Sequence, residues 1–299
     1  PLKTFDFEDQ YKKQVIDPMF KDYAKGITPN PDSLCNKIIK FPLLWKEAKK
    51  LGADYIATGH YIKKTLDKTS NSYKLKLPKD KTKDQSYFLY ELTQKDLSHT
   101  LFPIYHLTKE EVRAIAKKYK FPNHDKRSTR GICFVGKINM KSFLKQKINP
   151  KPGPLINQEG LEIGKHNGVM FYTIGERVRD KFQFKISKVF KNKINKKKYY
   201  IASKNTHKNE ITIAPENHKL LKTKQFKIIK TNIISPSKKL PKNLKVKIRH
   251  LSPLLKATLT KKSNKLICTL NRTQTGIAEG QSCVFYHNSE VLGGGEIRL

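Results

Sequence analysis

The 299-residue sequence is poor in cysteine and in acidic residues, and it has no long apolar run. Its four cysteines include no Cys-x-x-Cys pair, so neither a structural zinc site nor a disulfide-rich scaffold is expected. No stretch approaches the roughly 20 apolar residues of a membrane-spanning helix, and no basic and then apolar leader opens the sequence. These absences predict a cytoplasmic protein in a reducing environment, with no membrane partner.

Several common catalytic strings are also missing. The sequence contains no HExxH, no GxxxxGK[ST] and no Ser-His-Asp ordering, so zinc hydrolases, P-loop proteins and serine hydrolases have no local support. No metal-binding residues are predicted. The sequence opens with Pro1 rather than methionine, so residue 1 is not expected to be the natural start.

Positive charge is what the sequence has in excess. Lys and Arg number 62 against 25 Asp and Glu, which gives a net charge of +37 and predicts a polyanionic partner, nucleic acid above all. Runs such as Lys191–Tyr200 are crowded with Lys, Asn and Ile, so the codon usage of a genome rich in A and T is an alternative source of part of this charge. The length predicts two domains or three small ones.

The first part of the chain predicts helices around a short strand. Apolar residues at four-residue steps from Phe5 to Tyr23 predict a helix. Asn30-Pro31-Asp32 predicts the start of a second helix that carries Cys35 and breaks before Pro42. A third helix, 43–50, and a buried strand, 54–58, should follow. Gly59 and His60 come after this strand, where open α/β sheets bind ligands, although a simple turn is the alternative.

The remaining sequence changes from helical to β patterns. Lys63–Lys83 predicts a hairpin, and a capping box at Thr108 predicts a helix over 109–119. Beyond Pro150, short alternating runs predict β structure, including 164–175 and a final hairpin over 283–292. The charge run 191–198 is expected to be a solvated loop.

Two cysteines are candidates for chemistry. Cys133 follows a cluster of cations that would favour its thiolate, namely Lys126, Arg127 and Arg130. Cys35 stands early in a predicted helix, whose N-terminal dipole would do the same. For both, a buried cysteine that acts as a small hydrophobe remains an alternative. Cys268 and Cys283 have apolar neighbours and are expected to pack in a core.

Seven strings resemble, in sequence and in order, those of the tRNA-specific 2-thiouridylase family, and together they span nearly the whole chain. They are Thr28–Asn36, Leu51–Tyr61, Lys83–Tyr90, Gly131–Gly136, Tyr172–Arg177, Gly280–Gln281 and Leu292–Gly295.

The resemblance implies an enzyme that uses ATP and Mg²⁺ to replace the C2 oxygen of wobble uridine 34 in tRNA with sulfur. Cys133 would carry the sulfur as a persulfide, and Cys35 would be the nucleophile that helps to release it through a transient disulfide. The implied partners are the anticodon region of tRNA and a persulfide sulfur-donor protein. A monomer is expected.

The resemblance also implies the binding residues. Gly59 would contact ATP. The residues that would contact tRNA are Asn30, Pro31, Asp32, His60, Lys83, Asp84, Gln85, Arg249, His250 and Gln281.

The implied fold is α/β plus β in three domains. An adenine-nucleotide α-hydrolase-like domain with a parallel sheet, truncated at its N-terminus, would occupy residues 1–136. A small central β-rich domain that binds tRNA would occupy 137–218, and a C-terminal β-barrel 219–299.

The sequence departs from the family at three places. The family's Ser-Gly-Gly-x-Asp-Ser string for ATP is absent, so the numbered chain is not expected to bind ATP properly. Ser128-Thr129 stands where the family has Asp-Ser, and 178–181 replaces a Gly-rich run. One alternative is therefore a degenerate, non-catalytic tRNA- or RNA-binding protein, and a weaker one is an ATP-pyrophosphatase that acts on a small molecule.

Overall fold

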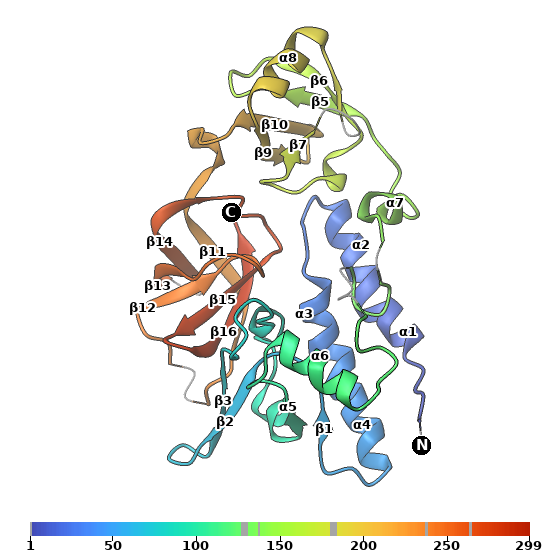
Figure 1. Cartoon of the computed structure of the whole chain (residues 1–299). Coiled ribbons are helices and arrows are strands. Elements are labelled where there is room, and N and C mark those ends of the chain that lie inside the picture. Colours follow the sequence, from blue (N-terminus) through green and yellow to red (C-terminus); the bar gives the residue numbers. More distant parts are fainter. Residues whose placement is uncertain (1, 127–130, 137, 180–183, 237–238, 263–264) are drawn as a thin grey trace.

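The computed structural model describes residues 2–126, 131–136, 138–179, 184–236, 239–262 and 265–299. Figure 1 shows three parts: a helical N-terminal part, a central β-rich part and a C-terminal barrel. The departures noted at Ser128-Thr129 and at 180–181 lie outside the described residues.

Two long helical rods, 8–24 and 31–50, dominate the N-terminal part, and each contains a π-helical turn. Their segments are α1 (Glu8–Tyr11), η1 (Lys12–Ile16) and α2 (Asp17–Ala24), then α3 (Pro31–Cys35), η2 (Asn36–Lys40) and α4 (Pro42–Lys50). The apolar stripe predicted for the first rod is buried at Val15, Met19 and Tyr23. The predicted break near Phe41 is confirmed as a boundary between two elements: η2 ends at Lys40, Phe41 is a turn, and α4 begins at Pro42. A proline suits this first helical position, because its missing N–H would have no helical partner there.

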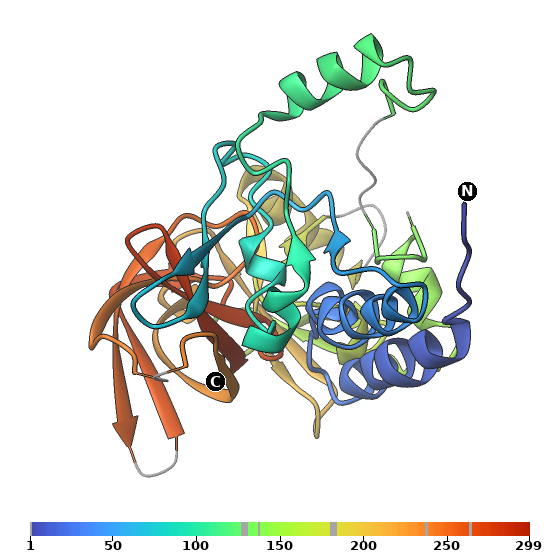
Figure 2. The same ribbon diagram turned by 90° about the horizontal axis from the view of Figure 1, so that it is seen from below.

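A small parallel sheet confirms the α/β expectation. It pairs β1 (Ile56–Ala57) with β4 (Thr100–Leu101). Around it lie β2 (Lys63–Asp67) and β3 (Ser72–Lys76), which form the predicted hairpin, and η3 (Ser86–Phe88), α5 (Gln94–Ser98) and α6 (Lys109–Lys118). The predicted capping box at Thr108 opens α6, the green helix that projects from the body in Figure 2.

The central part is a six-stranded sheet with the order β7-β9-β10-β5-β6-β8. Its elements are α7 (Met140–Leu144), β5 (Gly153–Ile156), β6 (Glu162–His166), η4 (Val169–Phe171), β7 (Arg177–Val178), β8 (Phe184–Ile186), α8 (Lys188–Lys196), β9 (Tyr199–Asn205) and β10 (Glu210–Pro215).

Two predictions for the central part are corrected. The supposed loop 191–198 is mostly α8, because Phe190 and Ile194, one helical turn apart, are both buried. The expected β structure in 164–175 ends at His166 and gives way to the 3₁₀ turn η4.

The C-terminal part closes on itself as a barrel. Its elements are η5 (Lys219–Leu221), β11 (Lys222–Ile233), β12 (Asn243–Lys247), β13 (Leu255–Lys262), β14 (Lys265–Thr275), β15 (Ser282–His287) and β16 (Glu290–Arg298). The sheet order β11-β14-β13-β12-β15-β16 is closed by pairing between β11 and β16. The predicted final hairpin is β15–β16, and β3 adds the β2–β3 hairpin to its edge.

Across the described residues, every helix is too short or too polar to cross a membrane.

Candidate active site

The structure brings Cys35 and Cys133 together. Cys35 is the last residue of α3 and is fully buried, whereas Cys133 is half-buried in a loop. The Cys35 thiol is hydrogen-bonded to the Cys133 sulfur, and both cysteines are free of disulfides. Residues far apart in the sequence therefore form one dithiol site.

The loop that carries Cys133 is held from both helical rods. The Cys133 backbone N–H donates to Oδ1 of Asp32 at 3.0 Å, across 101 residues of sequence. The Tyr11 hydroxyl donates to the Cys133 carbonyl, and a β-bridge joins Ile132 to Gly136. These contacts fix the position of the Cys133 sulfur against the end of α3.

The two thiols have opposite electrostatic environments. The hydrogen bond from Cys35, assisted by the nearby Lys40 ammonium, lowers the pKa of Cys133 to about 6. The same hydrogen bond to Cys133, together with burial, raises the pKa of Cys35 far above its ordinary value. Near neutral pH, Cys133 is therefore the thiolate and Cys35 the thiol that donates to it.

The cation beside Cys133 is not one that the sequence suggested. Lys40 Nζ lies 3.4 Å from the Cys133 sulfur. Of the predicted cations, Arg127 and Arg130 lie outside the described residues and Lys126 is exposed. The helix-start argument for Cys35 also differs from the structure, since Cys35 ends α3 rather than beginning it. The five-residue spacing from Cys35 to Lys40 does not by itself predict that both face Cys133, because this arrangement depends on the π turn between them.

The residues around α3 join this site to the barrel. Asn30 caps α3 through Ser33 N at 3.3 Å, Pro31 follows at the first helical position, and Asn30 Nδ2 donates to Ser282 Oγ at 3.1 Å. Gln281 Nε2 donates to the carbonyls of Thr28 at 3.0 Å and Pro29 at 3.2 Å. The expected tRNA residues Asn30 and Gln281 thus join the segment at the start of α3 to the barrel.

A second group of expected tRNA residues lies around Asp84. This buried carboxylate pairs with Lys247, and His250 Nε2 is 3.0 Å from the Asp84 carbonyl. Gln85 Oε1 accepts from Tyr61 N at 3.0 Å. Lys83 is half-buried at the edge of the group.

Gly59 and His60 occupy the carboxyl end of β1, as predicted. His60 is buried between the rings of Phe41 and Phe102, and burial lowers its pKa to about 3, so its imidazole is neutral. Gly59 is exposed, and a Cβ there would meet nothing within 4 Å. This open backbone is compatible with the close approach of a nucleotide. Among the described residues, no group of three or more His, Cys, Asp or Glu could hold a metal ion.

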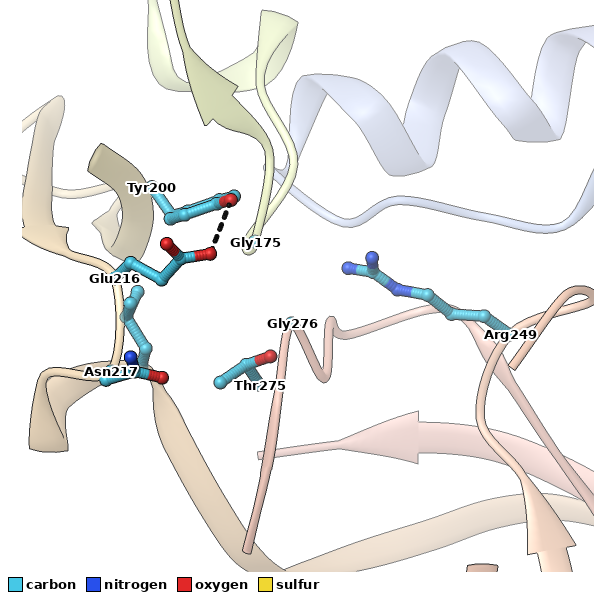
Figure 3. A pocket seen from close by; sticks show the side chains of 8 residues that line it. Gly175, Tyr200, Glu216, Asn217, Arg249, Thr275 and Gly276 are labelled. Carbon is cyan, nitrogen blue, oxygen red and sulfur yellow. Dashed lines mark hydrogen bonds between the residues drawn. The ribbon is translucent and has the colours of Figure 1, made fainter. Parts of the chain in front are cut away.

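Arg249 lies where the central sheet meets the barrel. Its Nη2 donates to the Ile174 carbonyl at 2.9 Å, and burial lowers its pKa. Figure 3 shows Arg249 directed towards Gly175 and Gly276, in a cavity of about 270 Å³. On the other side of this cavity, the Tyr200 hydroxyl donates a hydrogen bond to Glu216.

Three family models match the chain in succession. A tRNA methyl transferase HUP domain matches residues 1–137, a tRNA methyl transferase PRC-barrel domain matches 141–215, and an aminomethyltransferase β-barrel domain matches 222–297. The parallel sheet, the central sheet and the closed barrel therefore place the chain in the class of proteins with a HUP domain followed by two small β domains.

Curated relatives identify the family. The chain is 37% identical to tRNA-specific 2-thiouridylase MnmA 2 of Aliarcobacter butzleri, over 98% of this chain and 80% of the relative. It is 38% identical to MnmA of Hydrogenovibrio crunogenus, over 98% and 76%, and 40% identical to MnmA of Blochmanniella floridana, over 99% and 79%. The chain belongs to the tRNA-specific 2-thiouridylase family.

Proposed function

We propose that this protein thiolates tRNA, transferring persulfide sulfur to C2 of the wobble uridine at position 34. The observation that carries the proposal is the Cys35–Cys133 pair, in which one thiolate and one thiol share a hydrogen bond inside a member of a thiouridylase family. A thiolate is the form of cysteine that accepts sulfur.

The proposed sulfur transfer uses both cysteines. The Cys133 thiolate attacks the outer sulfur of a donor protein's persulfide, and the donor's inner sulfur leaves as a thiolate. The outer sulfur, now carried on Cys133, bonds to C2 of the uridine as the activated oxygen leaves. ATP with Mg²⁺, when bound, supplies that activation of the oxygen.

Release follows from the position of Cys35. Its sulfur, after losing its proton to solvent, attacks the Cys133 sulfur and breaks the S–S bond. The sulfur on C2 leaves with the bonding electrons as 2-thiouridine, and a Cys35–Cys133 disulfide forms. A thiol reductant of a reducing compartment then supplies two electrons and restores both thiols.

We propose that residues 1–136 provide this catalysis, with Gly59 as the point where ATP approaches, and that 137–218 and 219–299 add tRNA-binding surface. Extruding a loop nucleotide towards the cysteines requires little energy, because it is not held in a duplex. The half-buried residues Lys83, Gln85, Arg249, His250 and Gln281 would contact the tRNA, along with Asn30 and Pro31. Asp32, whose Oδ1 accepts the Cys133 N–H, would instead hold the Cys133 loop in place. His60 and Asp84 are buried and would shape the surface beneath.

The test is complementation of a bacterium that lacks its own 2-thiouridylase, with 2-thiouridine measured in digested tRNA by mass spectrometry. We expect the unmodified gene to restore 2-thiouridine and Cys133→Ser and Cys35→Ser each to abolish it. Cys268→Ser, a cysteine in the barrel core, is the matched control and should retain it. Thiolation that persists in Cys133→Ser would remove that residue from the mechanism.

The same experiment addresses the non-catalytic alternative. That reading predicts tight, salt-sensitive tRNA binding by the purified protein and no 2-thiouridine in the complemented cells.

A further inference from the structure

Lys40 occupies an unusual place for a lysine of this protein. It is half-buried, and its Nζ donates to the sulfur of Cys133 at 3.4 Å while lying 6.0 Å from the centre of the Phe134 ring. Other half-buried lysines pair with carboxylates, as Lys141 and Lys247 do, or donate to backbone carbonyls, as Lys64 and Lys204 do. Within the described ranges, Lys40 forms no such ion pair. Its charge is therefore directed at the dithiol site.

The π turn explains how Lys40 reaches the sulfur. Lys40 is five residues after Cys35, which on an α-helix at about 100° per residue would place it roughly 140° away from Cys35. The segment η2 (Asn36–Lys40) instead closes i→i+5 hydrogen bonds, and Phe41 N donates to the Asn36 carbonyl at 3.3 Å. The wider turn brings residue i+5 back towards residue i, so Lys40 and Cys35 face Cys133 together.

We propose that Lys40 is the cation that holds the negative charge of the sulfur pair, first on Cys133 and then, once the Cys133 sulfur is bonded to a second sulfur, on Cys35. The proposal rests on the roles given above to the two cysteines. In it, Lys40 determines the order in which Cys133 and then Cys35 act as nucleophiles.

The charges that face the pair support this sequence of events. Tyr11 and Asp32 contact the backbone of Cys133, Lys40 contacts its sulfur, and Lys40 is the cation among these three. Lys40 lowers the pKa of both thiols, whereas a Cys133 thiolate raises that of Cys35. When the Cys133 sulfur enters an S–S bond, its negative charge disappears and the influence of Lys40 on Cys35 is no longer opposed by it. Cys35 then becomes a better nucleophile at the step that requires one.

The first test measures Cys133 alone. Alkylation of Cys133 by iodoacetamide is followed by peptide mass spectrometry between pH 5 and 9 (about the range of thiol titration). In the unaltered protein the rate should fall as the pH drops through about 6, where the thiolate is protonated. Lys40→Met should move this midpoint upward by about one unit or more, and Lys40→Arg should largely keep it.

The second test measures the transfer to Cys35. Methyl methanethiosulfonate converts Cys133 to a methyl disulfide, and attack by Cys35 on the Cys133 sulfur then releases methanethiol and forms the Cys35–Cys133 disulfide. The mass lost from the intact protein reports the rate. Lys40→Met should slow this step about tenfold near pH 7, with recovery at higher pH, because one unit of pKa is a tenfold change in thiolate.

Lys37→Met is the matched control, since Lys37 lies on the same π turn but is exposed and paired with Glu91. It should leave both profiles unchanged. If Lys40→Met melts earlier than the unaltered protein, Lys40→Gln takes its place. An unchanged midpoint and an unchanged methanethiol rate in a folded Lys40 variant would overturn the proposal. Neither readout uses tRNA or ATP, so failure here is distinct from failure of the proposed thiolation.

Discussion

At the scale of single residues, Asp32 makes a contact that the resemblance did not suggest. It was expected to contact tRNA, yet its Oδ1 accepts the backbone N–H of Cys133 at 3.0 Å. Burial raises the pKa of Asp32, and the Cys133 N–H and the Lys40 charge oppose that rise. The carboxylate therefore positions the loop of Cys133.

Replacing Asp32 tests this positioning role. Asp32→Ala leaves the Cys133 N–H without a partner, which costs about 1–3 kcal/mol in a buried setting and frees the loop. We expect 2-thiouridine formation to fall at least tenfold with little change in tRNA affinity, both measured on purified protein. Asp32→Asn retains an acceptor oxygen and should recover most of the activity. A large loss of tRNA affinity in Asp32→Ala, with Cys133 alkylation unchanged, would return Asp32 to the tRNA-contacting group.

At the scale of elements, the joint between the central sheet and the barrel depends on close backbone approach. Gly175 and Gly276 both have positive φ, and a Cβ on Gly276 would lie 2.6 Å from Nη2 of Arg249. Any side chain at this position would displace the guanidinium that donates to the Ile174 carbonyl. The two glycines are thus required by the packing of Arg249 between two parts of the molecule.

Gly276→Ala therefore carries two penalties. An alanine at positive φ costs roughly 1–2 kcal/mol, and the clash with Arg249 adds to it. Gly52→Ala is the matched control, because Gly52 has φ of +81° but open space around its Cα. Denaturant unfolding should show a larger loss for Gly276→Ala than for Gly52→Ala, accompanied by weaker tRNA binding for the first alone. Equal losses would show that Arg249 adjusts without cost.

At the scale of the whole molecule, the charge of +37 acts as an attractive field for a polyanion. The dithiol site lies between the N-terminal helices and is joined through Gln281 and Asn30 to the barrel. Arg249 lies where the barrel meets the central sheet. Under the proposed function, a tRNA that reaches the cysteines would be held by all three parts.

The salt dependence of tRNA binding measures how much of this charge is used. The logarithm of affinity should fall linearly with the logarithm of salt concentration, by about 0.7–0.9 per neutralised phosphate. With six to ten contacts, affinity would fall about 10³–10⁵-fold between 50 and 200 mM salt. A slope that corresponds to only one or two neutralised phosphates would mean that most of the lysines do not contact tRNA. Codon usage would then be the favoured origin of those lysines.

Local chemistry allowed much of the fold to be predicted from the sequence. The cap at Asn30, the capping box at Thr108, the hairpin within 63–83 and the final hairpin depend on neighbouring residues, and all four are confirmed. The helix α8 was missed because its stability comes from burying Phe190 and Ile194, which charge patterning does not reveal.

Residue identities and their order are enough to establish the family, the two candidate thiols and the excess of positive charge. Which thiol carries the negative charge, and which cation faces it, follows from the three-dimensional arrangement. Asp32 holds the Cys133 loop in place, and the π turn directs Lys40 towards Cys133. Contacts between residues distant in sequence set a pKa, since electrostatic interactions depend on distance in space and on burial.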